Sequence, residues 1–443
     1  MPGQRDGAGG RPSPLVLLLP LLLLSVAAAC GGPSPTPTPS PTPSPAASAA
    51  SPSPTSAPSP SPSPASGAEV DAALDEIERQ VIQIRGLEPN REVARRFIDE
   101  DELRTMVTAM FDEETPPEYV AAVERFYKAF GLIPPDADLR ELTLDLLSGG
   151  VAGFYRSDQS TLYVVSPTGA LGVNEKITFA HEFDHALQDQ HTSVFRDQDG
   201  VLDRSDWILA RQAVYEGDAT WLMSLWSVEN FDLSDLAEML ALANDPEAAA
   251  LLERMPAILE ETLLFPYTTG MQFIQPIQVS GGWGAVDDLY DRLPESTEQI
   301  LHPEKYEARE EPVEVALPDD LAAELGIGWS VALEDTFGEL QLGIWLRETG
   351  RSPQEASGAA AGWGGDRLAV LQGPDDAWAV VFESAWDSPA DATEFADAAE
   401  AAADELSDPA TVVAADDDRV RILVASDEDT LLRLDVLLGG TGV

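Results

Sequence analysis

The stretch Thr178–His191, TFAHEFDHALQDQH, decides how the first half of this sequence is interpreted. Three of the four histidines in the 443-residue chain lie within it, at His181, His185 and His191. The first two are four residues apart, so on a helix they share one face and their imidazoles can bind the same metal ion. Glu182 follows His181 directly and can reach water bound to that ion. The stretch therefore predicts a metal-binding helix.

The spacing HExxH is that of zinc peptidase sites. A catalytic zinc ion has about three protein ligands and a fourth position for water, whose pKa falls to about 7. The Glu182 carboxylate can then deprotonate that water at neutral pH. The alternative is an ordinary helix with packing or surface histidines. Because histidine is rare in this chain and a strand pair precedes the helix, we favour the metal site.

Two residues compete for the position of third ligand. His191 lies six residues after His185, as in HExxHxxGxxH, but Gln188 replaces the glycine that turns the chain back to the metal. Glu216 lies in RQAVYEGDATWLMSLW (211–226), a second predicted helix with many apolar residues. A glutamate among apolar neighbours is expected to have a partner. We favour Glu216, although the same residue also fits an exposed polar stripe.

With HEFDHALQDQH and YEGDA together, the chain resembles the gluzincin class of thermolysin-like zinc metallopeptidases, in particular bacterial envelope members. The resemblance covers about residues 70–310. It implies three zinc ligands and a general base, namely His181, His185 and Glu216, with Glu182 as the base. The best-known members carry an acidic residue one helical turn after the glutamate ligand, where this chain has Thr220. The group that orients a liganding histidine is therefore unassigned.

Such peptidases also need a histidine or tyrosine that donates a hydrogen bond to the developing oxyanion. The candidates are His302, Tyr306 and Tyr267, and we place His302 in the predicted catalytic set. Ser296 fits the start of a short helix that ends near His302. In the alternative, His302 is a helix-end residue bonded to backbone carbonyls.

The N-terminus has the pattern of an export signal. A basic start precedes a short apolar run at 15–29, and Cys30, the only cysteine of the chain, follows it directly. This resembles a bacterial lipoprotein signal, with residues 1–29 as signal peptide and Cys30 lipidated. The alternative is a plain secretory signal. Residues 30–67, rich in Pro, Ser and Thr, predict an extended linker, so we expect a protein on the outer face of the membrane, or secreted.

The charge of the chain limits its partners. It has 78 acidic and 26 basic residues, a formal net charge of -52. Such a field repels nucleic acid and anionic lipid surfaces. We therefore expect a peptide or protein substrate, no nucleic acid, and membrane contact through the lipid anchor alone. The sequence does not predict the oligomeric state.

The folded part is predicted to be α+β. Residues 68–310 predict a mainly helical zincin-like peptidase domain, with a β-hairpin at 151–166 before the metal helix, which we place between Asn174 and Gln190. The edge of that hairpin is a candidate to pair with an extended peptide. Residues 311–443 predict a small C-terminal α+β domain of order ββαββα.

The leading interpretation is thus a membrane-anchored, extracytoplasmic zinc-dependent peptidase with Glu182 as general base. One alternative is a non-catalytic envelope binding or scaffold lipoprotein that retains a zinc site. Another makes the C-terminal domain a binding module and the helical domain its spacer. The glutamate beside the first histidine favours the enzyme.

Overall fold

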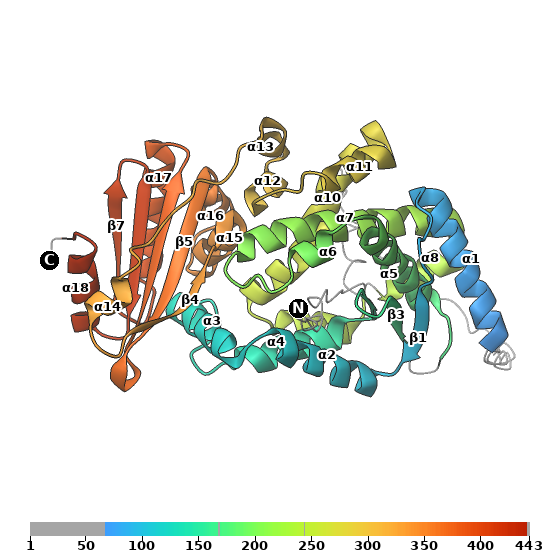
Figure 1. Cartoon of the computed structure of the whole chain (residues 1–443), viewed down its shortest axis with the longest axis horizontal. Coiled ribbons are helices and arrows are strands. Elements are labelled where there is room, and N and C mark those ends of the chain that lie inside the picture. Colours follow the sequence, from blue (N-terminus) through green and yellow to red (C-terminus); the bar gives the residue numbers. More distant parts are fainter. Residues whose placement is uncertain (1–66, 167–168, 243, 441–443) are drawn as a thin grey trace, which may run out of the picture.

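The structure is a computed structural model that describes residues 67–166, 169–242 and 244–440. The predicted signal peptide (1–29), Cys30 and the linker lie outside the described residues, apart from Gly67. The described chain is α+β, as predicted, with many helices around two separate sheets (Figure 1). Within these ranges no helix is long and apolar enough to cross a membrane.

The first sheet has three strands, in the order β1-β3-β2. The predicted hairpin is present as β2 (Gly153–Arg156) and β3 (Thr161–Val165), which pair antiparallel. The third strand, β1 (Ala94–Ile98), pairs parallel with β3. Four helices belong to this part of the chain: α1 (Gly67–Arg85), α2 (Glu100–Glu114), α3 (Pro117–Ala129) and α4 (Leu139–Gly150).

Two buried helices form the centre of the molecule, α5 (Val173–His191) and α7 (Ser205–Asn230). The N-cap of α5 is Gly172 and not Asn174, because the Glu175 carboxylate accepts a hydrogen bond from the Gly172 N–H at 2.9 Å. The surrounding helices are α6 (Val194–Asp197), α8 (Leu233–Leu242), α9 (Pro246–Glu253), α10 (Ala257–Gly281), α11 (Trp283–Tyr290), α12 (Thr297–Leu301) and α13 (Pro303–Ala308).

Helices α7 and α10 pack against each other at a pair of glycines. A Cβ atom at Gly270 would lie 2.2 Å from the Ala213 carbonyl oxygen, and one at Gly217 would lie 2.3 Å from the Gly270 carbonyl carbon. No side chain fits at either position, so the two backbones are in direct contact. This contact sets the position of α7, the helix that carries Glu216.

The second sheet is antiparallel, in the order β4-β5-β6-β8-β7. Its strands are β4 (Ser330–Asp335), β5 (Trp363–Gln372), β6 (Trp378–Trp386), β7 (Ala410–Asp416) and β8 (Arg419–Ala425). The helices of this region are α14 (Leu321–Leu325), α15 (Gly338–Glu348), α16 (Pro353–Ala360), η2 (Pro374–Asp376), α17 (Pro389–Ala403) and α18 (Glu428–Leu437). The predicted ββαββα order is β5-β6-α17-β7-β8-α18, and β4 adds a strand that was not predicted.

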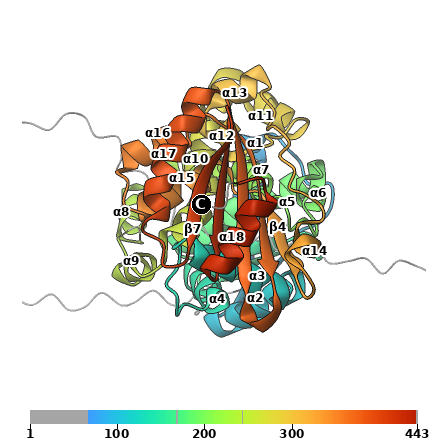
Figure 2. The same cartoon turned by 90° about the vertical axis from the view of Figure 1, so that its left-hand side faces the viewer.

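Successive side chains of β6 bury on opposite faces of this sheet, as strand geometry requires. Val380 and Phe382 belong to the cluster that includes α15, α16 and α17, whereas Ala379 and Val381 belong to the cluster that includes α14 and α18. Figure 2 views the molecule from the side on which α18 lies, so that α18 is in front of the strands. The sheet is therefore covered on both faces.

The two predicted domains share one hydrophobic cluster. Phe126 and Phe130 of the α3 region contact Phe337, and Phe130 also contacts Trp345 and Phe382 of the C-terminal region, with ring centroids 5.0–6.5 Å apart. Figure 1 shows α3 beside β4. The boundary near residue 310 thus separates two segments of sequence, but α3 packs into the core of the second.

Candidate metal centre

Three of the predicted site residues meet between α5 and α7. The Nε2 atoms of His181 and His185 are 3.0 Å apart, and each lies 3.2–3.3 Å from Oε2 of Glu216. All three side chains are buried, with residue exposures of 0–3 %. The i, i+4 spacing puts the two imidazoles on one face of α5, and α7 crosses that face with the glutamate.

These distances suit a tetrahedral zinc ion. Metal–ligand bonds of about 2.0–2.1 Å at tetrahedral angles put neighbouring ligand atoms about 3.3 Å apart. The observed 3.0–3.3 Å separations correspond to one face of such a tetrahedron. Three such atoms in close contact are stable only with a proton or a metal ion between them. The donor set therefore fits zinc, with a fourth position left for another ligand.

The pKa values of His181, His185 and Glu216 indicate that the cluster favours a positive charge. Burial alone lowers the pKa of His185, but the charge and the hydrogen bond of Glu216 more than offset it and raise the pKa to about 9. Burial lowers the pKa of His181. Burial raises the pKa of the Glu216 carboxyl, yet its histidine neighbours lower it overall. The protein groups alone thus hold a proton where a cation would sit.

Glu182 lies beside this cluster without a strong partner of its own. Neither of its oxygens has a hydrogen bond of good geometry within the described part of the chain, and the residue is fully buried. Burial raises the pKa of its carboxyl to about 8, against the lowering effects of the His185 charge and the Tyr155 backbone. A buried carboxylate with such weak hydrogen bonding is unfavourable for folding alone, so the residue is a candidate for chemistry.

Gln188 orients His185, one of the two predicted histidine ligands. Its side-chain NH₂ group donates to Oδ2 of Asp184 at 3.1 Å and to the Tyr215 carbonyl at 2.9 Å. Its Oε1 is therefore an acceptor, and it receives the His185 Nδ1 proton at 2.8 Å. This assigns a proton of His185 to Nδ1, so Nε2, which faces His181 and Glu216, is the nitrogen available to a metal ion. The amide thus performs the orienting function that the sequence left unassigned.

Arg85 of α1 links α5 and α7, the two helices that carry the predicted ligands. Its guanidinium, 1 % exposed, lies 3.6 Å from Asp184 of α5 and 3.1 Å from Asp218 of α7. Asp287 of α11 adds a third carboxylate at 2.7 Å, and the Tyr290 hydroxyl donates to Asp218 at 2.8 Å. Burial raises the pKa of Asp184 to about 7, which the Arg85 charge opposes. The cation therefore holds Asp184 in place, and Asp184 holds Gln188.

Sequence reasoning missed Arg85, although a signal was present. The apolar stripe of α1 runs through Val70, Leu74, Ile77 and Val81, and Arg85 occupies the next position at the same spacing. A basic residue that continues a buried stripe is expected to meet acidic partners inside the protein.

The structure separates the remaining candidates. The Tyr267 ring of α10 stacks on His181, with centroids 6.1 Å apart. His302 instead pairs through Nε2 with Glu339 at 2.8 Å and lies 4.0 Å from Glu304, so its described partners are outside the metal cluster. Tyr306 donates its hydroxyl proton to the Arg292 carbonyl at 2.8 Å. Of the three oxyanion candidates, Tyr267 is the one in contact with a predicted ligand.

His191 is also apart from the cluster. Its Nε2 lies 2.8 Å from the Glu88 carbonyl oxygen, at the exposed end of α5. As the sequence predicted for a helix that continues through Gln188, the ring points away from the pair formed by His181 and His185.

Comparison with known proteins concerns the other end of the chain. A family model described as a domain of unknown function (DUF8575) matches residues 330–435, which run from β4 into α18. No curated protein and no solved structure matches the chain. The matched segment does not include the residues of the metal centre.

Proposed function

We propose that this protein is a zinc-dependent peptidase of the gluzincin type, with a zincin-like domain that holds zinc on His181, His185 and Glu216. The observation that carries the proposal is the convergence of two imidazole nitrogens and a carboxylate oxygen beside a buried carboxylate that has no well-formed hydrogen bond. Three protein ligands leave room for a water, which favours a catalytic over a structural zinc ion.

Zinc would act as a Lewis acid and lower the pKa of a bound water to about 7. Glu182 would take the proton of that water and pass it to the nitrogen of the leaving amine. A raised pKa makes its carboxylate a stronger proton acceptor, and burial raises it here. Gln188 would hold His185 in the correct tautomer, and Tyr267, beside His181, would stabilise the oxyanion.

The hairpin is a candidate to position the substrate. Strand β2 lies at the edge of its sheet, and the backbone of its residue Tyr155 is close enough to lower the pKa of Glu182. A peptide that pairs with β2 would present its backbone beside that carboxylate. The proposed location is the outer face of the membrane, through a lipid on Cys30, or the medium. Fractionation of a Cys30→Ser variant tests the anchor, because the variant should leave the membrane fraction.

One observation favours a second candidate function. The ligands and Glu182 are all at most 3 % exposed, as in sites where zinc only stabilises a fold. In that case the protein would be a binding or scaffold lipoprotein that retains zinc.

The variant Glu182→Gln separates the two functions. Glutamine has the size of glutamate but cannot accept a proton at neutral pH. If the protein is a peptidase, the variant should keep zinc and lose about 10²–10⁴-fold in the rate of hydrolysis of an unfolded protein such as casein. Glu229→Gln, at the exposed end of α7, is the matched control and should cleave like wild type.

Two results would favour the scaffold. One is a Glu182→Gln variant that cleaves as fast as wild type, and the other is cleavage that a zinc chelator does not affect. A wild-type protein that binds zinc tightly but hydrolyses none of a broad set of peptides would also count against catalysis.

A further inference from the structure

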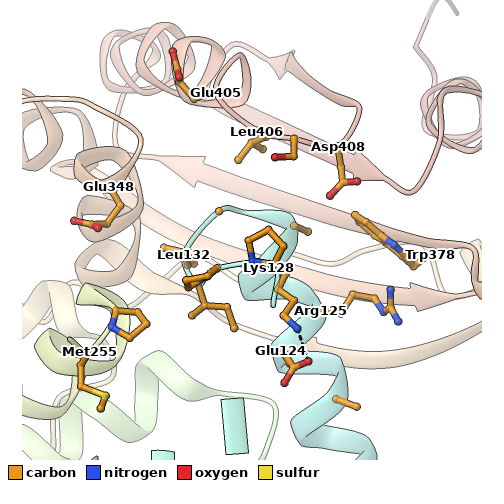
Figure 3. A pocket seen from close by; sticks show the side chains of 18 of the residues that line it. Glu124, Arg125, Lys128, Leu132, Met255, Glu348, Trp378, Glu405, Leu406 and Asp408 are labelled. Atoms are coloured by element: carbon orange, nitrogen blue, oxygen red, sulfur yellow. Dashed lines mark hydrogen bonds and ion pairs between the residues drawn. The ribbon is translucent and has the colours of Figure 1, made fainter. Parts of the chain in front are cut away.

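A second site lies between α3 and the C-terminal sheet, in a cavity of about 890 Å³ (Figure 3). One wall is α3 with the turn that follows it. The opposite wall consists of Trp378 at the start of β6 and residues 405–408, which join α17 to β7. The junction of α9 and α10 closes a third side. Junctions between domains are frequent places for ligand sites.

Among the charged side chains that line the cavity, Arg125 and Asp408 have opposite charges and no described ion-pair partner. Arg125 makes no hydrogen bond or ion pair to any described residue, and its guanidinium lies 5.7 Å from the centre of the Trp378 ring. Asp408 likewise has no described side-chain partner, and partial burial raises the pKa of its carboxyl. In the view of Figure 3, Asp408 lies on one side of Trp378 and Arg125 on the other.

The two charged residues beside Arg125 on α3 already have partners. Lys128 pairs with Glu124 at 2.8 Å, and the second oxygen of Glu124 accepts the Leu139 N–H at 2.8 Å. This leaves Arg125, and the exposed Arg254 on the third side of the cavity, as cations without a described carboxylate partner in a protein with three times as many acidic as basic residues. A guanidinium that stays unpaired in such surroundings is available to an outside carboxylate.

The surface between the two charges is apolar. Leu132, Met255 and Leu406 line the cavity, and the face of Trp378 continues this surface. A purely anionic ligand would be repelled by Asp408, Glu348 and Glu405, and a purely cationic one by Arg125 and Arg254. The cavity is thus complementary to a ligand with both charges and an apolar part between them.

We infer that this cavity binds a short peptide with free termini. Its terminal carboxylate pairs with Arg125, its terminal ammonium pairs with Asp408, and an apolar side chain packs on Leu132, Met255 and Trp378. The inference does not depend on the proposed function, because the cavity shares no lining residue with the metal centre.

The experiment is calorimetric titration of the whole mature protein with Ala-Leu-Ala and its pentapeptide homologue Ala-Ala-Leu-Ala-Ala. The protein carries Glu182→Gln so that the peptides remain intact. Each peptide is compared with its C-terminal amide and its N-acetyl form, and we expect either block to weaken binding about 10-fold or more. Arg125→Gln should lower the affinity for the free peptide about as much as the C-terminal amide does, and it should leave the affinity for the amide itself unchanged.

Asp408→Asn should lower the affinity for the free peptide about as much as N-acetylation does, and it should leave the affinity for the acetylated peptide unchanged.

Arg96→Gln is the control, since it removes an arginine of β1 that pairs with Glu102 at 2.7 Å. It should not change the affinity for peptide. The inference is overturned if neither peptide binds at millimolar concentration, if the blocked peptides bind as tightly as the free ones, or if the Arg125 and Asp408 variants bind like the control. Variants with wild-type circular dichroism and melting temperature exclude misfolding as the cause of a loss.

Discussion

The structure gives Gln188 a role that the sequence did not indicate. In the sequence, it is the residue that disqualifies His191, because it continues the helix where a glycine would turn the chain. In the structure, it also fixes the ring of His185 by accepting its Nδ1 proton while donating to Asp184. The orientation of a metal-binding imidazole depends on such a partner, which holds the ring and raises its basicity.

The variant Gln188→Leu tests this role. Leucine has a similar volume but cannot accept the Nδ1 proton, so zinc affinity should fall by about 10–100-fold. Competition with a chromophoric chelator measures the affinity, and circular dichroism checks the fold. Gln190→Leu, two residues further along α5 and bonded to the Arg91 backbone, should bind zinc like wild type. If Gln188→Leu binds zinc as tightly as wild type, the Gln188 amide has no role in metal binding.

The predicted ligands could be identified from sequence because their pattern is local. His181 and His185 are one helical turn apart, and Glu216 lies among apolar residues in the second predicted helix. Their supports could not be identified, because Arg85 is 99 residues before Asp184 and 133 before Asp218. The choice of Tyr267 over His302 as the aromatic or imidazole neighbour of the site also depends on how α10 packs, which no local pattern records.

At the scale of elements, the crossing of α7 and α10 controls the site. The Gly217–Gly270 contact leaves no space for a Cβ atom, and Gly217 directly follows the third predicted ligand. Any separation of the two backbones moves Glu216 relative to α5. The precision of the metal centre therefore depends on two residues that have no side chain.

Gly270→Ala should destabilise the protein by about 1–3 kcal/mol through overpacking, and it should weaken zinc binding at the same time. Urea unfolding and a zinc titration measure the two effects. Gly284→Ala is the matched control, since Gly284 also lies in a helix but a Cβ atom there meets nothing within 4 Å. It should be neutral or slightly stabilising. If both alanine variants behave alike, the backbone contact has no such role.

The elements that could be predicted from the sequence are those with a regular apolar pattern. Helices α5 and α7 and the strands β2, β3 and β5 to β8 have regular apolar patterns, and the predicted segments lie close to the observed ones. Strand β1, ARRFI, was not predicted because two arginines interrupt its pattern. Helix α10 extends through Pro266 and Pro276, which normally indicate helix ends, because the helix packs along α7 over its length.

At the scale of the molecule, buried carboxylates accumulate where the C-terminal region meets the helical part. Asp335 accepts bonds from the N–H and the hydroxyl of Ser205, the first residue of α7, and so connects β4 to the helix that carries Glu216. Asp366 accepts the N–H groups of Phe337 and Gly338. Burial nevertheless raises the pKa of Asp335 and of Asp366 to about 6.

These shifts predict that the apoprotein is more stable in mild acid. Burial also raises the pKa of Glu298, to about 7, so between about pH 4 and pH 7 the folded chain binds more protons than the unfolded chain. The free energy of unfolding should therefore increase as the pH falls from about 8 to about 5, and level off near pH 4, where the unfolded carboxylates are protonated too. The lower net charge in acid acts in the same direction.

Urea unfolding of the apoprotein between pH 8 and pH 5 measures this dependence. Asp335→Asn should reduce its slope, because asparagine removes one of the titrating groups. An unfolding free energy that stays constant, or that increases with pH over this interval, would contradict the shifts.

The central claim is that one zinc ion is held by His181, His185 and Glu216, and metal analysis of the purified protein tests it most directly. The predicted result is about one zinc per chain for wild type and for His191→Ala, and none for the His181→Ala/His185→Ala double variant. Glu216→Ala should bind zinc far more weakly than His191→Ala. Stoichiometric zinc in the double variant, or a loss of zinc in His191→Ala with normal binding in Glu216→Ala, would contradict the account.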